Sequence, residues 1–184
     1  MTEAPAPMRC SHDAAAAPRV VVMGVSAVGK SSVAIALAQR LAIPLCDADD
    51  LHPESNRAKM RGGVPLTDED RWPWLDDVGR TIADADGGIV VACSALRRVY
   101  RDRLRAHAPD VVFVHLTGTA ELLAERAAGR RGHFMPPALL ASQLATLEPI
   151  APDETAVVLD VTASVDELAD AAVAWIGARS ERGI

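Results

Sequence analysis

A loop in which two glycines bracket four residues, followed by Lys and Ser, constrains this chain more than any other feature. The segment Gly24-Val25-Ser26-Ala27-Val28-Gly29-Lys30-Ser31 follows the β-branched run at 19–23 and opens an apolar, helix-periodic stretch at 32–41. The backbone N–H groups of such a loop face inward, and the following helix adds the positive end of its dipole, so the two together hold phosphate groups. A glycine-rich turn with an ordinary surface lysine is the alternative, but it does not explain why this loop joins a strand to a helix.

The pattern also assigns roles within the loop. Lys30 is expected to reach the β- and γ-phosphates, and the Ser31 hydroxyl to hold Mg²⁺. Of the 19 basic residues only Lys30 and Lys59 are lysine, so Lys30 stands out in a chain that otherwise uses arginine. The other expected nucleotide contacts are Gly24, Ser26, Ala27, Val28, Gly29 and Ser32.

The rest of the chain alternates between apolar strands and helices. Strands are expected at 19–23, 44–46, 89–93, 111–116 and 156–161. Helices are expected at 32–41, 53–61, 67–85, 97–106, 120–128 and 137–147, and a last one after a capping box formed by Ser164 and Glu167. Continuously apolar strands separated by helices indicate an α/β fold, with a parallel sheet covered by helices on both faces.

Length and composition favour one domain. The chain has 184 residues without a repeat or a linker, so a single domain is expected over 19–184, with a short lid at about 128–136. Residues 1–18 are rich in Ala and Pro and lack the pattern of a secretory signal, so they are expected to form a disordered tail. Three cysteines without a paired spacing indicate reduced thiols and a cytoplasmic protein.

The overall charge excludes some classes of partner. A net charge of −6 argues against general binding of nucleic acid or anionic membranes, and no apolar run approaches the length of a membrane span. A GTPase is also excluded, because the chain has no Asn-Lys-x-Asp segment to read guanine and no lysine after Lys59. A small kinase with a second substrate opposite the γ-phosphate remains.

The acidic segment after the second strand, Asp47-Ala48-Asp49-Asp50, suits such a kinase. It lies where open α/β sheets bind ligands, past the carboxyl end of a strand. If the segment is extended, Asp47 and Asp49 project to the same side and Asp50 points away. Asp47 is then expected to orient Mg²⁺ through water, and Asp49 to hold the acceptor hydroxyl and accept its proton. The alternative is a solvated acidic turn that caps the next helix.

Longer motifs in the same order closely resemble the gluconokinase family, and the resemblance runs from Val20 to Ile176. Besides the phosphate loop they are Asp47 to Pro53, Asn56 with Lys59-Met60, Pro65 to Arg71 with Trp74-Leu75, Cys93 to Arg98 with Tyr100-Arg101-Asp102, and Gly132 to Pro136 with Gln143 and Leu147-Glu148. One departure is that Ala27-Val28 stand where the family more often has Gly or Ser.

The resemblance implies a three-layer P-loop kinase fold like that of nucleoside-monophosphate and shikimate kinases, with a five-stranded parallel sheet in the order 2-3-1-4-5. It implies ATP- and Mg²⁺-dependent phosphorylation of D-gluconate on its 6-hydroxyl, by a homodimer. Two alternatives are another small-molecule P-loop kinase, such as a shikimate-like one, and a nucleotide-binding regulator without catalysis.

A sugar acid needs cations for its carboxylate and hydrogen-bonding groups for its hydroxyls. The cation candidates are Lys59, Arg97, Arg98 and Arg101, and His52 and His133 are further expected to contact the acceptor. In the lid, Arg126 and Arg130 are expected to neutralise charge on the transferring phosphoryl group, with Arg130 as the catalytic one. Adenine is expected between a lid arginine and the loop at 161–163.

Overall fold

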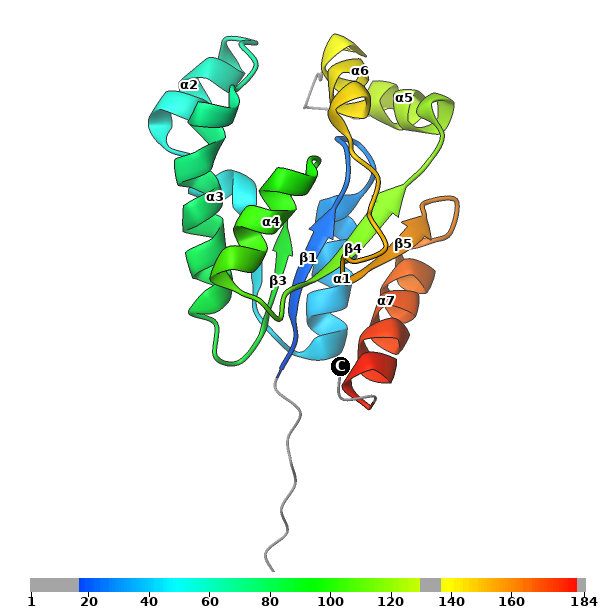
Figure 1. Cartoon of the computed structure of the whole chain (residues 1–184). Helices are drawn as coiled ribbons and strands as arrows, with labels where there is room; N and C mark the ends of the chain where they lie inside the picture. Colours follow the sequence, from blue (N-terminus) through cyan, green and yellow to red (C-terminus); the bar gives the residue numbers. More distant parts are fainter. Residues whose placement is uncertain (1–16, 130–136, 182–184) are drawn as a thin grey trace, which may run out of the picture.

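A five-stranded parallel sheet organises the molecule (Figure 1). The computed structural model describes residues 17–129 and 137–181. The strands lie in the order β2-β3-β1-β4-β5, as the family resemblance implies. They are β1 (Arg19–Met23), β2 (Leu45–Asp47), β3 (Ile89–Ala92), β4 (Val112–Thr117) and β5 (Ala156–Asp160). The helices are α1 (Lys30–Leu41), α2 (Glu54–Arg61), α3 (Asp68–Ala83), α4 (Arg98–His107), α5 (Ala120–Gly129), α6 (Pro137–Thr146) and α7 (Val165–Ser180).

Two of the helices begin at the N-terminal caps that the sequence predicts. Thr67 caps α3 and Ser164 caps α7, each in a reciprocal capping box with the acid three residues on. The main difference from the predicted elements follows β2, where residues 48–51 form a 3₁₀ helix, η1 (Ala48–Leu51), instead of an extended segment. The Asp47 carboxylate accepts a hydrogen bond from Asp49 N at 3.1 Å and so closes that turn.

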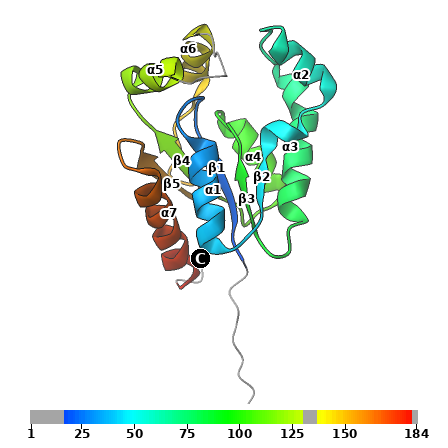
Figure 2. The ribbon, with the colours of Figure 1, turned by 180° about the vertical axis from the view of Figure 1, so that it is seen from behind.

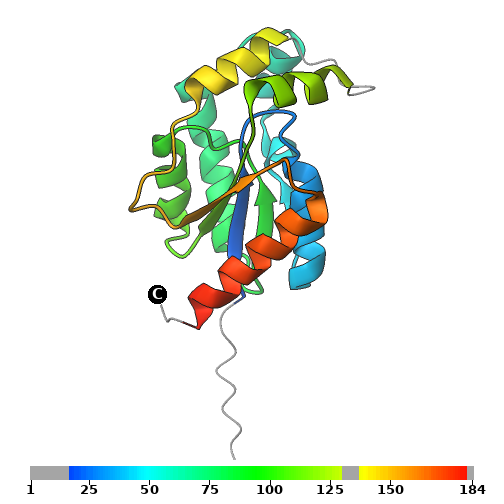
Figure 3. The same ribbon diagram turned by 90° about the vertical axis from the view of Figure 1, so that its right-hand side faces the viewer.

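The three central strands, β1, β3 and β4, bury both of their faces, which explains why they read as continuous apolar runs. On β1, Val20 and Val22 belong to a core with α1 and α7, whereas Val21 and Met23 belong to a core with α3 and α4. Figure 2 shows α1 and α7 in front of the sheet, and Figure 3 shows the sheet from its side. The molecule therefore has three layers, with the sheet in the middle.

The carboxyl ends of the parallel strands meet at one edge, where the two remaining groups of helices stand. In Figures 1 and 2, α2 and the start of α3 lie on one side of the loop that follows β1, and α5 and α6 lie on the other. Leu123 of α5 and Leu140 of α6 are buried in the same core as α1 and α7, which anchors both helices at this edge.

Some expectations concern residues that the structure does not describe. Residues 1–16, most of the expected tail, and Arg130 and His133 of the expected lid lie outside the described ranges. The contacts of the fold begin slightly before the predicted boundary, because Ile89 N donates to the carbonyl of Pro18 at 3.0 Å. No helix within 17–129 and 137–181 is long and apolar enough to cross a membrane.

Candidate active site

The phosphate loop joins β1 to α1 at the carboxyl edge of the sheet. Gly24 and Gly29 adopt φ values of 141° and 102°, which other residues rarely reach. Gly29 caps α1 without a side chain, and the first turn of α1 carries no acid, so its amide groups and its positive end suit an anion. Lys30 Nζ donates to the carbonyl of Val25 at 3.0 Å, and Ser31 is exposed.

The two loop residues that depart from the family pattern are accommodated differently. Ala27 takes a left-handed φ of 63°, a conformation that glycine adopts more readily. Val28 is buried and packs into the core shared by α1 and α7. The Val28 side chain therefore helps to anchor the loop to the core, and the residue also borders the cavity beside the loop.

The acid cluster stands beside this loop. The pKa of Asp49 is raised, first by partial desolvation and then by the negative charge of Asp47, while the positive charge of Lys30 opposes the shift. The Asp49 side chain nevertheless remains 81% exposed. The surrounding protein therefore excludes only part of the water near the carboxylate, and the carboxylate stays accessible to a ligand. The thiol of Cys93, directly after β3, has a pKa that is raised first by burial. The charges of Asp49, Lys30 and Asp47 also act on that pKa. The nucleotide-side cation and the two carboxylates thus gather around one point.

His52 lies on the same side of η1 as Asp49, with its Nε2 4.0 Å from Asp49 Oδ1. The ring is buried, stacks on Trp74 at 4.1 Å between ring centroids, and has a pKa lowered to about 4 by burial and by Arg71. Asn56 Nδ2 lies 3.3 Å from His52 Nδ1. Because that amide can only donate, the neutral ring carries its proton on Nε2, which faces Asp49.

Three of the expected acceptor-site cations sit in ion pairs at this end of the molecule. Lys59 Nζ bonds both carboxylate oxygens of Asp70, at 2.6 and 2.7 Å. Arg97 pairs with Asp68 and, at 3.3 Å, with Glu148, and its guanidinium lies over the ring of Tyr100. The Arg98 guanidinium makes two bonds of 2.7 Å to Asp153, before β5. A bound sugar acid would join these networks or displace one of their acids.

The expectation that Arg101 binds the substrate carboxylate is corrected. Its side chain is fully buried and forms two bonds, of 2.6 and 2.8 Å, with the equally buried Glu154. Its remaining donors hold the backbone carbonyls of Ala95, Leu96, Glu148 and Pro149. Burial alone would raise the pKa of Glu154, but the bonds from Arg101 keep it below its usual value. Arg101 thus has a structural role and no donor left for a ligand.

A cavity of about 380 Å³ adjoins the phosphate loop on the α7 side. Its wall combines the start of α1, Arg126 of α5 and the residues that lead into α7, among them Ala163 and Val165. The Arg126 guanidinium donates to the carbonyl of Val161 at 2.7 Å. The two segments between which adenine is expected, the arginines of the lid segment and the loop after β5, therefore meet at Arg126.

The donor set for a metal ion is small. Within residues 17–129 and 137–181 no group of three or more His, Cys, Asp or Glu side chains could hold one. Ser31 and Asp47 offer one hydroxyl and one carboxylate, and Asp47 already accepts from Asp49 N. Two protein ligands are too few to coordinate a metal ion by themselves. They fit Mg²⁺, which usually keeps several water ligands and binds to the phosphates of a substrate.

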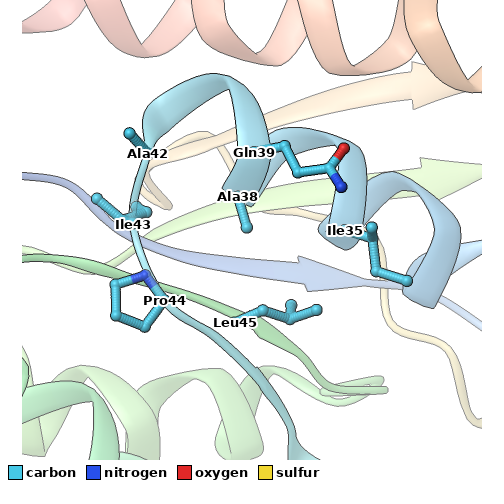
Figure 4. Close-up of a pocket in the computed structure, with 7 residues that line it drawn as sticks. All are labelled: Ile35, Ala38, Gln39, Ala42, Ile43, Pro44 and Leu45. Atoms are coloured by element: carbon cyan, nitrogen blue, oxygen red, sulfur yellow. The ribbon is translucent and has the colours of Figure 1, made fainter.

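A shallow apolar groove lies at the other end of α1, away from the loop. It is lined by Ile35, Ala38, Gln39, Ala42, Ile43, Pro44 and Leu45 (Figure 4). With one amide and otherwise apolar side chains, it lacks the charged groups that a phosphate or a sugar acid needs. The polar site at the carboxyl edge is therefore the candidate active site.

Two contacts in the site had no expected role from the sequence. Gln143 of α6 accepts a hydrogen bond from Ser26 N at 2.6 Å, and Arg71 lies over the ring of Tyr100. Both residues stand in the quoted family motifs, which was the only signal for them, because their partners are 117 and 29 residues away in sequence.

Comparison with known proteins identifies relatives. No protein-family model matches the chain. The gluconokinase of Gluconobacter oxydans (strain 621H) is 49% identical over 138 residues, which are 73% of this chain and 78% of the relative. The probable gluconokinase of Rattus norvegicus is 42% identical over 174 residues, or 83% and 94% of the two chains. The crystal structure of a gluconokinase from Sinorhizobium meliloti 1021 matches with a TM-score of 0.84 and 46% identity, covering 90% of this chain and 95% of that one.

Proposed function

The chain belongs to the gluconokinase family, and from that premise we propose that it transfers the γ-phosphoryl group of ATP to the 6-hydroxyl of D-gluconate. The observation that carries this proposal is that the phosphate loop and the acid cluster lie next to each other. Lys30 of the phosphate loop lies close enough to Asp49 for its charge to act on that carboxylate. A phosphate donor and a hydroxyl acceptor held by these two groups would therefore face each other.

On the acceptor side, Asp49 and His52 act together. Asp49 accepts the proton of the 6-hydroxyl while the hydroxyl oxygen bonds to the γ-phosphorus and the bond to the leaving ADP oxygen breaks. The raised pKa of Asp49 makes it a stronger base than an ordinary aspartate. Neutral His52, fixed by Asn56 and Trp74, presents Nε2–H 4.0 Å from Asp49, so one hydroxyl can bridge the two.

The carboxylate of the sugar acid is proposed to bind among Lys59, Arg97 and Arg98. The pairs that Lys59 and Arg97 form with Asp70 and Asp68 keep both cations at the carboxyl edge of the sheet. His133, outside the described residues, is proposed as a further contact of the acceptor.

On the nucleotide side, adenine is proposed to occupy the cavity beside Arg126, with the phosphates along residues 24–32. Mg²⁺, held by Ser31 and through water by Asp47, would offset phosphate charge. Arg130, also outside the described residues, is proposed to act on the charge that develops during transfer, so Arg130→Ala should lower kcat more than it raises the KM for gluconate.

The domain and assembly expectations also stand as proposals. They are an N-terminal tail that ends before Pro18, one domain from there to residue 184 with a lid at about 128–136, and a cytoplasmic homodimer. The family resemblance supports the dimer, and light scattering on the purified chain tests it.

A coupled ADP-release assay over D-gluconate, other sugar acids, shikimate and nucleoside monophosphates tests the activity. We expect ADP release with D-gluconate, and none from the Lys30→Ala variant, which serves as the control for contaminating kinases. Turnover with shikimate or a nucleotide alone would replace gluconate as the acceptor. ATP binding without turnover on any acceptor would favour the regulator.

A further inference from the structure

The carboxylate of Glu148 binds the start of α4 at two points. The N-cap residue of α4, Arg97, makes no capping bond with its side chain, and the first turn of the helix carries no acid. Glu148, two residues past the end of α6, accepts a hydrogen bond from Arg98 N at 2.5 Å and another from Arg97 Nε at 3.3 Å. A helix N-terminus favours such a negative group. One carboxylate therefore caps the helix and binds Arg97 at the same time.

The backbone of Glu148 is fixed as well. Its N–H donates to the carbonyl of Leu96 at 2.8 Å, and its own carbonyl accepts at 3.3 Å from Arg101, whose side chain is fully buried. The bond from Arg98 N lowers the pKa of the Glu148 carboxyl, and the bond from Arg97 adds to this effect. At neutral pH a charged carboxylate is thus held at a set place beside Arg97.

Arg97 is held from two directions. Its Nη1 pairs with Asp68, the first residue of α3, and its Nε pairs with Glu148. Acids on two different nitrogens fix the plane of a guanidinium, whereas one acid on one nitrogen leaves the plane free to turn about that bond. The Arg97 side chain is nevertheless 34% exposed, so a ligand can reach it.

Arg97 also lies on the acceptor side of the site. The guanidinium groups of Arg97 and Arg71 lie over the same ring, that of Tyr100, at 5.5 and 5.6 Å from its centroid. Burial and then the charge of Arg71 lower the pKa of His52, the ring beside Asp49. Arg97 therefore shares a ring with the arginine whose charge reaches His52.

We propose that Glu148 is a positioning residue for the acceptor: its carboxylate holds the guanidinium of Arg97 in the orientation that binds the carboxylate of the sugar acid. Glu148 does not touch the substrate, because two carboxylates repel each other, and the hydrogen bonds from Arg97 and Arg98 N offset its charge. This proposal rests on the proposed function, since it takes Arg97 as a ligand of the sugar acid.

Steady-state kinetics of Glu148→Gln in the full chain tests it. The amide oxygen keeps the bond from Arg98 N, but the amide nitrogen then faces Arg97 Nε, donor against donor, and the ion pair is lost. We expect the KM for D-gluconate to rise roughly threefold to tenfold, with kcat and the KM for ATP within about twofold. The Tm should fall by no more than about 3 °C, because the cap is kept.

Glu54→Gln is the matched control. It removes the exposed partner of Arg61 on α2 and should leave both KM values, kcat and the Tm unchanged. A double-mutant cycle with Arg97→Met then separates positioning from a general loss of structure. If Glu148 acts through Arg97, Glu148→Gln should raise the KM for D-gluconate by less than about twofold once Arg97 is replaced. Calorimetric binding of D-gluconate takes the place of KM for any variant that turns over too slowly.

An unchanged KM for D-gluconate in Glu148→Gln, or an equal rise with and without Arg97, would overturn the proposal. A lower KM would overturn it too, because it would mean that Glu148 competes with the substrate for Arg97. An unaltered KM in Arg97→Met would remove both Arg97 and Glu148 from the acceptor site while leaving the phosphoryl transfer intact. Wild-type protein that does not phosphorylate D-gluconate would instead refute the proposed function itself.

Discussion

Asp49 and Asp50 are adjacent in sequence but differ in their surroundings. In a 3₁₀ helix, residues three apart share a side, so Asp49 lies with His52 whereas Asp50 lies on another side. The pKa of Asp49 is raised, first by partial desolvation, and Lys30 is near enough to act on it. Asp50 meets the neighbouring helix through its backbone, whose carbonyl accepts from Arg57 at 2.5 Å.

Asp49→Asn should therefore lower kcat by about two orders of magnitude or more, the range for a lost general base, with ATP affinity nearly unchanged. The change keeps the shape of the side chain and removes only its charge. Asp50→Asn is the matched control and should be close to neutral. Steady-state kinetics on both variants checks this, and equal damage at the two positions would mean that the base has been assigned to the wrong residue.

Gly24 is a second residue at which a single added atom, a Cβ, is expected to destabilise the protein. A Cβ at this glycine would lie 2.6 Å from the backbone carbonyl oxygen of Leu116, and its φ of 141° is itself strained for alanine. Gly24→Ala should cost about 1–3 kcal/mol of stability and weaken nucleotide binding, because neither backbone can yield freely. Gly63→Ala, at a φ of 69° with open space around it, is the control that measures strain without a clash. Thermal unfolding and nucleotide titration distinguish them, and equal losses of stability would contradict the clash.

The loop and the acid cluster could be predicted from the sequence because their residues are neighbours in the chain. The role of Arg101 could not, because Glu154, its partner, comes 53 residues later and no local pattern signals burial of a charge. Arg97, Arg98 and Arg101 were expected at the acceptor site together, but α4 turns Arg101 inward and leaves Arg97 and Arg98 partly exposed.

At the scale of elements, Arg101 fastens α4 to two segments that reach it from elsewhere. It bonds Glu154 before β5 and the carbonyls of Glu148 and Pro149 after α6. Arg101→Met should cost about 3–5 kcal/mol, because the buried carboxylate of Glu154 loses both bonds to the guanidinium. Among the described residues, that carboxylate keeps only the bond from Ala151 N at 2.9 Å and the more distant Arg105 at 3.9 Å. The double variant with Glu154→Leu should recover part of this loss. Denaturant unfolding measures both, and a raised KM for gluconate at unchanged stability would return Arg101 to the acceptor site.

The elements themselves were predicted to within a few residues wherever a cap or a glycine marks their ends, as Thr67 and Ser164 do. The turn after β2 was predicted wrongly as extended, because Asp47 closes it with its side chain and an acidic run does not reveal that bond. Strand order depends on pairing between distant segments, and the expected order came from the family resemblance rather than from the pattern of strands.

Across the described part of the molecule, many surface arginines pair with acids. Asp76 pairs with Arg103, and Asp153 with Arg98, and these hydrogen bonds lower the pKa of each carboxyl to about 2. What such pairs contribute to stability is present at neutral pH and is lost only as the pH falls below the ordinary value of 3.8 for aspartate. Any loss of stability in milder acid must come from groups that titrate higher.

Two buried histidines account for such a loss, because each would take up a proton near pH 6.5 once the chain unfolds. Burial lowers the pKa of His115 below 6.5, helped by the charge of Arg101 and opposed by that of Glu154, and burial with Arg71 lowers that of His52 to about 4. Neither ring nitrogen of His115 meets a hydrogen-bond partner among the described residues. Below pH 6.5 the unfolded chain therefore binds protons that the folded chain resists, so stability falls with pH, by at most about 1.4 kcal/mol per pH unit for each histidine.

Thermal unfolding followed from pH 7.5 to 4.5 should accordingly show a Tm that falls steadily below about pH 6.5. His115→Leu removes one of the two groups and replaces an unpartnered polar ring with an apolar side chain. It should leave the stability at pH 7.5 unchanged or higher, and the fall of its Tm with acid should be shallower, because only His52 still resists protonation. Identical slopes for the wild type and the variant, or a Tm that stays level down to pH 4.5, would mean that the folded chain accepts the proton on His115, which its burial beside Arg101 opposes.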